Sequence, residues 1–464
     1  MRRASARAPI LALAAICAVA AALYVRSLHT SANFDEGVYL ASLDALRHGQ
    51  ALGTHVDIPQ PPGFYVLLQA IGAIFGNSVE GVRTGFLVVA LAGLALAYFA
   101  GRAVAGEAGG IGAAALLAVT HPYPTQAAQV EADTISTVLA LAAIVVLTAA
   151  RRRTWPSFAS GALAGAALSV KLLAAPVVAP LAVLVLARRA PRQALALVAG
   201  ATVVVGALLL RYAYALGDLW QSVVVEHGRA QSIGGPGLAD NAHRVLLHPL
   251  DWHTPAGVFV PIGLVAVVIL GRRLETLAFG SWIVAAAAFL IYQRPLLDHH
   301  LVLIATALAV PAGAGLGAVV ARLARPVALA ATAALALAFA AAFVQEHRRL
   351  AGNDVRNSPE VRWAVVKLRE ETRPDEPVAT DLPIVPYLAD RRVEGELIDS
   401  SYGRLNTQTL TTRKILEILD RRRIRVVLVA RNYRKKPDLL AALAARFPTR
   451  LRSGDMTLYV RRAG

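Results

Sequence analysis

The chain has 464 residues, of which 56% are hydrophobic and only 17% are charged. This composition is too apolar for a soluble globular protein and is typical of a membrane protein with many spans. The formal charge of +17 does not indicate a nucleic-acid partner, because much of it lies in short arginine clusters between apolar runs. The one cysteine, Cys17, excludes a disulfide within the chain and a thiolate metal site.

Apolar segments predict about eleven membrane spans. The first, Pro9 to Val25, resembles a signal peptide, but no good small-residue cleavage site follows it, so we expect a retained span. The apolar run from Phe64 to Phe75 is shorter than the ~20 residues needed to cross a bilayer and predicts a helix lying at the membrane surface. The other spans are expected at about 82–101, 110–122, 133–150, 157–170, 172–187, 194–216, 255–271, 276–293, 299–321 and 326–345.

The arginine clusters predict the orientation of these spans. With eleven spans all the clusters fall on one face, and the positive-inside rule makes that face cytoplasmic. The first loop (26–63), the 123–132 and 217–254 loops and the C-terminal region then face outward, as expected for a multi-pass protein of the plasma membrane. The clusters are Arg2/Arg3/Arg7, Arg102, Arg151/Arg152/Arg153, Arg188/Arg189/Arg192, Arg272/Arg273 and Arg322/Arg325.

Residues 346–464 have the composition of a soluble domain, so we expect a multi-span module over 1–345 and an extracytoplasmic α/β domain after it. Ser358 is the predicted cap of a helix, and further helices are expected near 385–389, 410–419 and 437–445. The runs PVATDL, IRVVLVA and MTLYV predict strands. Strands that alternate with helices indicate a partly parallel sheet. Its basic surface is best explained by solvation near anionic lipid headgroups.

The first loop contains the sharpest candidates for chemistry. Asn33 is a plausible cap and Gly49 a stop for a short amphipathic helix that begins with Asp35 and Glu36. A carboxylate at the membrane edge can take a proton from a hydroxyl and make it a nucleophile. The alternative is that the two acids only favour the helix dipole, worth ~0.3–1 kcal/mol.

Three further residues of this loop, His55, Asp57 and Gln60, are candidates for binding an acceptor. They precede a Pro-Pro-Gly turn, Pro61 to Gly63, that cannot continue as regular helix.

Other outward loops add weaker candidates. His227, with Glu226 or a first-loop acid, has the ligand chemistry of a divalent metal site, although a lone surface histidine is the commoner explanation. Asp133 is a second acid that can position an acceptor, or else a helix N-cap.

Cations near the outer ends of spans are candidates for binding a phosphate. Lys171 lies between two apolar runs, where a lone charge must pair or snorkel. Arg294 opens a later outward turn that also contains His300.

Together these pieces resemble the GT-C membrane glycosyltransferases, in particular the protein O-mannosyltransferase-like and aminoarabinose-transferase-like branch. The resemblance extends over residues from about 10 to 310, in the family's order and with similar spacing. The matching pieces are FDEGVYLASLDALRHGQ, PQPPGFYVLLQAIGAIFG, EGVRTG, EADTIST, GALAGAALSVKLLAAPVVAP and GDLWQSVVVEHGRAQS.

The resemblance implies a set of roles. The family's catalytic acid of the first loop falls on Asp35, with Glu36 completing the pair. Its later acid falls on Asp133 and its lysine between two spans on Lys171. Aminoarabinose-type members bind a metal through a histidine, here His227, and a glutamate that precedes a Lys-Pro pair. Both that glutamate and that lysine are missing here, because the matching positions read Gln60-Pro61.

The resemblance therefore implies a glycosyltransferase that moves a hexose or pentose from a polyprenyl-phosphate donor to a hydroxyl of a protein, lipid or glycan, with a divalent metal as a candidate cofactor. Asp35 is expected to be the general base, and Lys171, Arg294 and His300 to meet the donor phosphate. The alternatives are a transporter or a lipid-binding membrane protein without catalysis, and a pseudoenzyme or scaffold. The gathering of polar residues at the outer ends of spans and the lack of related halves favour an enzyme over a transporter.

Overall fold

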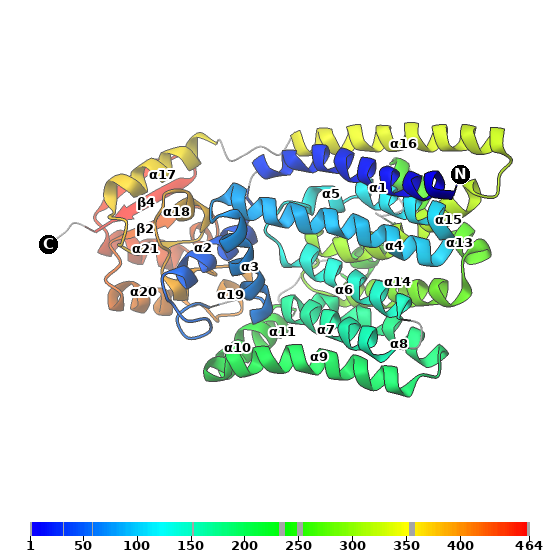
Figure 1. The fold of residues 1–464 in the computed structure, drawn as a ribbon. Helices are drawn as coiled ribbons and strands as arrows, with labels where there is room; N and C mark the ends of the chain where they lie inside the picture. The colour runs from blue at the N-terminus through cyan, green and yellow to red at the C-terminus, as the bar shows by residue number, and fades with distance from the viewer. Residues whose placement is uncertain are drawn as a thin grey trace. The chain divides into compact units, whose positions relative to one another are not determined.

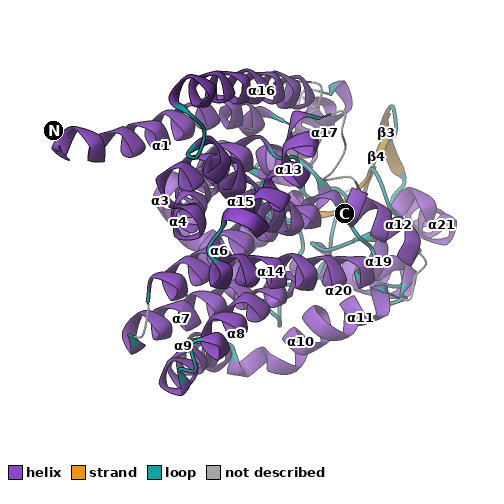
Figure 2. Cartoon of the chain, turned by 90° about the vertical axis from the view of Figure 1, so that its right-hand side faces the viewer, coloured by secondary structure: helices purple, strands orange, loops and turns teal. Residues whose placement is uncertain are grey.

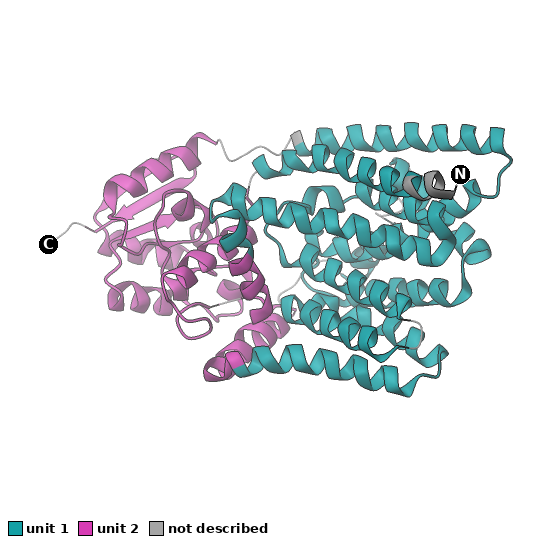
Figure 3. Ribbon diagram, in the orientation of Figure 1, with its two compact units in different colours: residues 1–29, 71–210, 235–353 teal, residues 30–70, 211–234, 354–464 magenta. Residues whose placement is uncertain are grey.

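The computed structural model describes residues 2–30, 32–57, 59–150, 153–231, 237–247, 254–351 and 358–461. The chain divides into two compact units, which are described separately below (Figure 3). Unit 1 comprises residues 1–29, 71–210 and 235–353, and unit 2 comprises residues 30–70, 211–234 and 354–464. Arg151 and Arg152 of the arginine clusters lie outside the described residues.

Unit 1 is a bundle of helices that pack side by side (Figure 1). Short 3₁₀ or π turns join several of them, namely η1 (Val25–His29), η2 (Leu172–Val177), η5 (His243–Leu247) and η7 (Asp298–Leu301). The helices are α1 (Arg2–Tyr24), α4 (Val79–Val119), α5 (Tyr123–Gln126), α6 (Ala132–Ala149), α7 (Thr154–Val170), α8 (Val178–Ala187), α9 (Pro191–Arg211), α12 (Leu238–Ala242), α13 (Pro255–Leu270), α14 (Arg273–Tyr292), α15 (Val302–Val320) and α16 (Arg325–Ala351).

Every predicted span contains helix, and seven helices of the described residues are long and apolar enough to cross a membrane. One of the seven, α4, contains two predicted spans. Its helix geometry breaks at Ala105 and Gly106, where Gly106 has a φ of +76° that favours glycine. The remaining predicted spans are the shorter helices α7, α13, and η2 with α8.

Close contacts between small residues hold unit 1 together. A Cβ atom at Gly112 of α4 would lie 2.1 Å from the carbonyl oxygen of Gly313 of α15. On the next helix, a Cβ atom at Gly263 of α13 would lie 2.1 Å from the carbonyl oxygen of Ala312. Such backbone approach is how helices associate in a bilayer, where apolar contact alone gives no preference for another helix over lipid.

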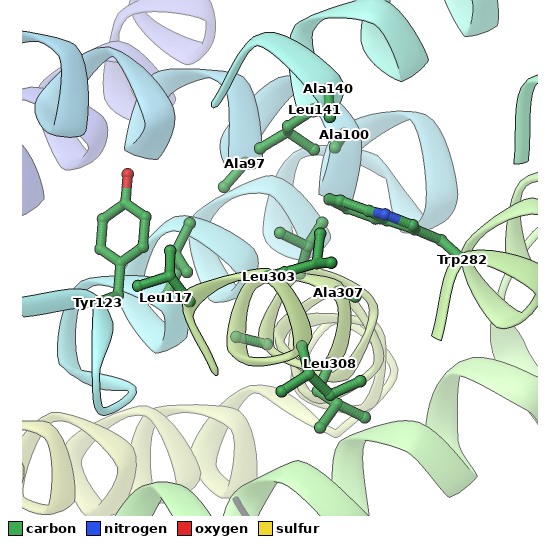
Figure 4. Packing of buried hydrophobic residues seen from close by; sticks show 14 of the residues in the cluster. Ala97, Ala100, Leu117, Tyr123, Ala140, Leu141, Trp282, Leu303, Ala307 and Leu308 are labelled. Atoms are coloured by element: carbon green, nitrogen blue, oxygen red, sulfur yellow. The ribbon is translucent and has the colours of Figure 1, made fainter. Parts of the chain in front are cut away.

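Larger side chains fill the space that remains between these helices. Figure 4 shows Trp282, Leu141 and Leu303 packed beside alanines such as Ala97 and Ala307. α15 is buried from Val302 to Ala318, as expected for a central helix that is apolar on all sides.

The outer helices of unit 1 leave apolar side chains exposed. On α9 these include Leu195 and Leu210, and on α16 they include Leu329 and Leu337. Exposed apolar surface of this extent marks a face that contacts lipid or another apolar partner. The pattern agrees with a membrane bundle.

Unit 2 combines the C-terminal domain with two loops of the earlier chain, and it contains all the strands of the described residues (Figure 2). The earlier segments supply α2 (Phe34–Arg47), the start of α3 (Pro62–Phe75), η3 (Ala213–Ala215), α10 (Leu216–Trp220), η4 (Gln221–Val225) and α11 (Glu226–Ala230). The C-terminal region supplies α17 (Pro359–Glu371), β1 (Ala379–Thr380), α18 (Ile384–Leu388), η8 (Gly395–Leu397), α19 (Tyr402–Asn406), α20 (Thr412–Arg421), β2 (Val426–Val429), η9 (Tyr433–Lys435), α21 (Pro437–Arg446), β3 (Thr449–Ser453) and β4 (Met456–Val460).

The four strands form one sheet in the order β1-β2-β4-β3. β1 is parallel to β2, and the other two pairings are antiparallel, so the expectation of a partly parallel sheet is confirmed. The Ser358 hydroxyl accepts a hydrogen bond from the Val361 amide, which confirms the predicted cap of α17. β3 was not predicted, because its sequence TRLRS has one apolar residue and exposes both arginines.

Asp381 joins the ends of β1 and β2. Its buried carboxylate accepts hydrogen bonds from the backbone amides of Ala430, Arg431 and Tyr433, at 2.7, 2.8 and 2.6 Å. These amides follow a strand and have no ladder partner there, so the side chain satisfies donors that burial would otherwise penalise.

Candidate active site

The predicted helix at the start of the first loop is α2. The side chain of Asn33 caps it by accepting a hydrogen bond of 2.7 Å from the Glu36 amide, and Gly49, with a φ of +79°, follows its end. Asp35 is half-buried and Glu36 is fully buried, both in the first turn of α2. Backbone amides at this end of a helix favour negative charge, so the position stabilises both carboxylates.

The C-terminal domain contacts the same end of α2. Gly37 packs so closely on α18 that a Cβ atom there would lie 2.8 Å from the Ile384 amide nitrogen. The guanidinium carbon of Arg431 lies 5.3 Å from the ring centre of Phe34, within cation–π range. The C-terminal domain therefore contacts both Phe34, just before Asp35, and Gly37, two positions after it.

The candidates in the rest of the first loop differ in their surroundings. Gln60 is buried and donates a 2.9 Å hydrogen bond to the hydroxyl of Tyr39, so it ties the start of α3 back to α2. The expected turn over Pro61 to Gly63 is wrong, because α3 already begins at Pro62, and proline fits the first turn of a helix, where its missing N–H costs no hydrogen bond. Asp57 accepts a 2.8 Å hydrogen bond from the Arg404 guanidinium. His55 is exposed, and its Nδ1 lies 3.2 Å from the Thr54 hydroxyl.

Arg404 of α19 joins the three chain segments of unit 2. Besides Asp57, its Nε lies 3.1 Å from a carboxylate oxygen of Glu226, and its Nη1 donates a 3.0 Å hydrogen bond to the carbonyl oxygen of Asp399. The side chain is buried. No motif in the sequence distinguishes Arg404 from the other arginines of this domain, and the prediction missed it.

The charges around Arg404 alter one another's ionisation. Burial raises the pKa of the Glu226 and Asp399 carboxyls, although the guanidinium works in the opposite direction. Burial also acts to lower the pKa of Arg404, but Asp57, Asp399 and Glu226 outweigh it and raise that pKa above its ordinary value. The guanidinium therefore stays charged at any pH at which the protein is folded.

His227 does not share a metal-like cluster with Glu226. Its Nδ1 lies 3.2 Å from the Ser222 carbonyl oxygen, while the Glu226 carboxylate faces Arg404. Among the described residues, His227 belongs to no group of three His, Cys, Asp or Glu side chains at ligand spacing.

In unit 1 the structure brings together candidate residues that were predicted separately from the sequence. The Lys171 ammonium donates a 2.6 Å hydrogen bond to Asp133, and both side chains are buried. Lys171 thus pairs and does not snorkel. The alternative that Asp133 is a helix N-cap is wrong, because Glu131 occupies the cap position and Asp133 lies in the first turn of α6.

Two adjacent histidines complete this cluster. His299 has one ring nitrogen 3.9 Å from Asp133 and the other 4.0 Å from the buried carboxylate of Glu131. The ring of His300 stands perpendicular to that of His299, with centroids 4.5 Å apart. Glu131 and His299 were not among the predicted site residues, although each adjoins a motif that was.

The turn that contains Arg294 is bound to a neighbouring segment through a different arginine. Arg244 donates hydrogen bonds of 2.6 Å to the Leu296 carbonyl oxygen and 2.5 Å to Asp298. Arg294 itself is half-buried at the start of the turn.

The comparisons with known proteins agree on the class of fold. A family model described as dolichyl-phosphate-mannose-protein mannosyltransferase matches residues 59–212. A comparison with curated protein sequences finds no match.

Solved structures cover nearly the whole chain. ArnT from Cupriavidus metallidurans in the apo state has a TM-score of 0.70 at 16% identity, covering 96% of this chain and 97% of that one. ArnT bound to undecaprenyl phosphate has a TM-score of 0.71 at 16% identity, covering 97% and 98%. The Archaeoglobus fulgidus oligosaccharyltransferase has a TM-score of 0.53 at 13% identity, covering 90% of this chain and 69% of that one.

The chain thus has the fold of the GT-C membrane glycosyltransferases, with a small α/β domain at its C-terminal end. Its helices and this fold make it a multi-pass membrane protein.

Proposed function

We propose that this protein transfers a sugar from a polyprenyl-phosphate donor to an acceptor hydroxyl, with Asp35 as the general base. One observation carries the proposal: Asp35 lies in the first turn of α2, in the loop that follows the first helix of a GT-C fold. The match to the mannosyltransferase family model begins after this helix, at residue 59. ArnT, of the same fold, has been solved with undecaprenyl phosphate bound, which supports a polyprenyl-phosphate donor.

The proposed reaction is a single displacement at the anomeric carbon. The Asp35 carboxylate takes the proton of the acceptor hydroxyl as the hydroxyl oxygen bonds to that carbon. The bond between the anomeric carbon and the phosphate oxygen breaks, and polyprenyl phosphate leaves with the electron pair. Glu36, buried at the next position of α2, completes the proposed acidic pair.

Lys171, Arg294 and His300 are the proposed ligands of the donor phosphate. His300 Nδ1 accepts a 3.2 Å hydrogen bond from the Leu297 amide, which orients its ring in this turn. The ion pair with Asp133 orients Lys171. Cations held in this way stabilise the charge that develops on the leaving group.

Asp133 and His55 are the proposed contacts for hydroxyl groups of the substrates. The second carboxylate oxygen of Asp133, Oδ1, is buried and has no hydrogen-bond partner among the described residues. A buried oxygen of this kind gains free energy when a hydroxyl donates to it. Asp57 and Gln60 are proposed to hold the acceptor loop through Arg404 and Tyr39.

A divalent metal fits poorly at the cluster of Asp133, His299 and His300. The ligand atoms of Asp133, His299 and His300 lie within 4.8 Å of one another, but the Lys171 ammonium already occupies an oxygen of Asp133 at 2.6 Å. A cation added there would meet a like charge in a buried setting. We therefore route no step through a metal.

We further propose that the reaction takes place outside the cytoplasm. The support is the distribution of arginine, which under the positive-inside rule leaves the first loop and the C-terminal domain on the outer face. Accessibility of a cysteine introduced at exposed Thr54 to an impermeant thiol reagent tests this orientation.

The proposal is tested by measuring transfer from a panel of polyprenyl-phosphate sugars in membranes that contain wild type, Asp35→Asn or Asp44→Asn. Asp44 is a matched control, because it is half-buried on the same helix and pairs with His48 at 3.4 Å. Loss of a general base should lower the rate on the order of 10²–10⁴-fold in Asp35→Asn alone. Equal rates in all three proteins contradict the assignment.

The alternative is a transporter or a lipid-binding protein without catalysis. The buried Lys171–Asp133 pair favours it, since charged pairs inside a helical bundle often line a transport path. The same panel separates the two. A protein that binds or moves polyprenyl-phosphate sugars and transfers none of them to any acceptor supports the alternative.

A further inference from the structure

Three stretches of unit 2 that are far apart in the sequence meet at one buried guanidinium. Arg404 binds Asp57 of the first loop at 2.8 Å, Glu226 of α11 at 3.1 Å and the Asp399 carbonyl oxygen at 3.0 Å. It is 6% exposed. Each chain segment of the unit supplies one partner.

Only arginine has the geometry for this arrangement. Two nitrogens of the rigid guanidinium plane donate hydrogen bonds, Nη2 to Asp57 and Nη1 to the Asp399 carbonyl oxygen, while Nε lies 3.1 Å from Glu226 as an ion pair without a hydrogen bond. Lysine would place one point charge at the centre and could not direct its donors along both fixed hydrogen-bond directions while also facing Glu226. Arg404 therefore fixes the directions of its partners in addition to neutralising their charge.

The contact with Asp57 bears on Asp35 through the rest of the loop. Asp57 ends the turn that follows α2, and Gln60, three residues further on, donates to Tyr39 in the middle of α2. The N-terminal end of α2, which contains Asp35, packs on α18 at Gly37. Asp57 is thus linked, through Gln60 and Tyr39, to the helix whose first turn contains Asp35.

We infer that Arg404 is a positioning residue, by which the C-terminal domain sets the first loop and its acid in place for the transfer reaction. The inference rests on the proposed function for its catalytic consequence. Arg404 need not touch substrate in this role. Loss of a purely stabilising contact would lower only the fraction of folded protein. Loss of a positioning contact also lowers the kcat of the molecules that are folded.

The test compares Arg404→Gln, Arg404→Lys and Asp57→Asn with Arg446→Gln. Arg446 is a matched control, since it also pairs with a carboxylate of the C-terminal domain, Asp420 at 2.9 Å, but on an exposed surface. Glutamine at 404 should lower kcat about 10²-fold, the usual cost of a misplacement near 1 Å, and leave KM for the lipid donor within about twofold. Lysine should not restore kcat, Asp57→Asn should lower it by a smaller factor, and Arg446→Gln should match wild type.

Hydrogen exchange of the purified full chain supplies a readout that does not depend on turnover. Residues 50–57 and 222–230 should exchange faster in Arg404→Gln, while β2 at 426–429 stays protected. Asp57→Asn, which leaves Arg404 its other two partners, should speed exchange in the first segment only. It serves as the second variant if Arg404→Gln does not fold.

The outcomes are distinguishable. If kcat per folded molecule and loop exchange in both variants equal wild type, the positioning role is overturned. A kcat loss that lysine fully reverses overturns the geometric argument. If wild type transfers no sugar but exchange in the two segments responds as expected, the proposed function fails while Arg404 still positions the loop.

Discussion

Units 1 and 2 hold their charged residues in different ways. In unit 1 the pair Lys171–Asp133 lies beside His299, within a bundle of helices that pack closely at glycines and alanines. In unit 2 the ion pairs of Arg404 join distant parts of the chain, and Arg404 and Asp57 are 347 positions apart. Unit 1 thus combines a buried ion pair with close backbone approach between helices, whereas unit 2 joins its three chain segments through Arg404. Substitutions of matched size should fail for different reasons in the two units.

The largest effect on stability is expected at the buried pair of unit 1. Lys171→Met leaves the Asp133 carboxylate buried without its cation and should destabilise the fold by about 3–5 kcal/mol. The double variant Lys171→Met with Asp133→Asn removes both charges and should recover much of that loss. Thermal unfolding in detergent measures both. Equal losses for the single and double variants would show that the pair is not coupled.

Close packing in unit 1 predicts that replacing glycine by alanine destabilises the protein at one position and stabilises it at another. Gly112→Ala places a Cβ atom 2.1 Å from a backbone oxygen of α15, so α4 and α15 must separate, at about 1–3 kcal/mol. Gly280→Ala on α14 meets no atom within 4 Å and should stabilise its helix by up to ~1 kcal/mol. The comparison of the two unfolding temperatures checks this. Stabilisation by both substitutions contradicts close α4–α15 contact.

The smallest effect is expected at the helix caps, where unit 2 should show a functional consequence that unit 1 lacks. Asn33→Ala removes the acceptor of the Glu36 amide and should cost about 1 kcal/mol, fraying the turn that contains Asp35. Ser78→Ala removes the equivalent cap of α4, where the hydroxyl accepts from the Gly81 amide at 3.0 Å. Both should raise local hydrogen exchange, but only Asn33→Ala should slow transfer. Equal transfer rates would separate the α2 cap from the chemistry.

The parts of the structure that the sequence predicted are those set by neighbours along the chain. Asn33, two acids and the apolar face of α2 lie within one short segment, and the predicted helix is present. Ser358 likewise caps α17 as expected. The break of α4 at Gly106 also follows from local sequence, because two apolar runs flank a pair of glycines and a glutamate.

The contacts that build the candidate sites could not be predicted in this way. Lys171 is predicted as a charge that must pair or snorkel and Asp133 as a second acid that positions an acceptor, but nothing local shows that they pair across 38 positions. Arg404 is one of many arginines in its domain, and only the fold brings Asp57 and Glu226 to it. Sequence patterns report the period of one element, whereas these pairs depend on how elements pack.

We propose that Asp35 acts on the acceptor and not on the donor lipid. The most direct measurement determines polyprenyl-phosphate binding and sugar transfer in the same preparation of Asp35→Asn and wild type. We expect Asp35→Asn to bind the lipid within about twofold of wild type and to transfer sugar at a rate lower by on the order of 10²–10⁴-fold. Transfer at the wild-type rate, or a loss of binding as large as the loss of transfer, would contradict it.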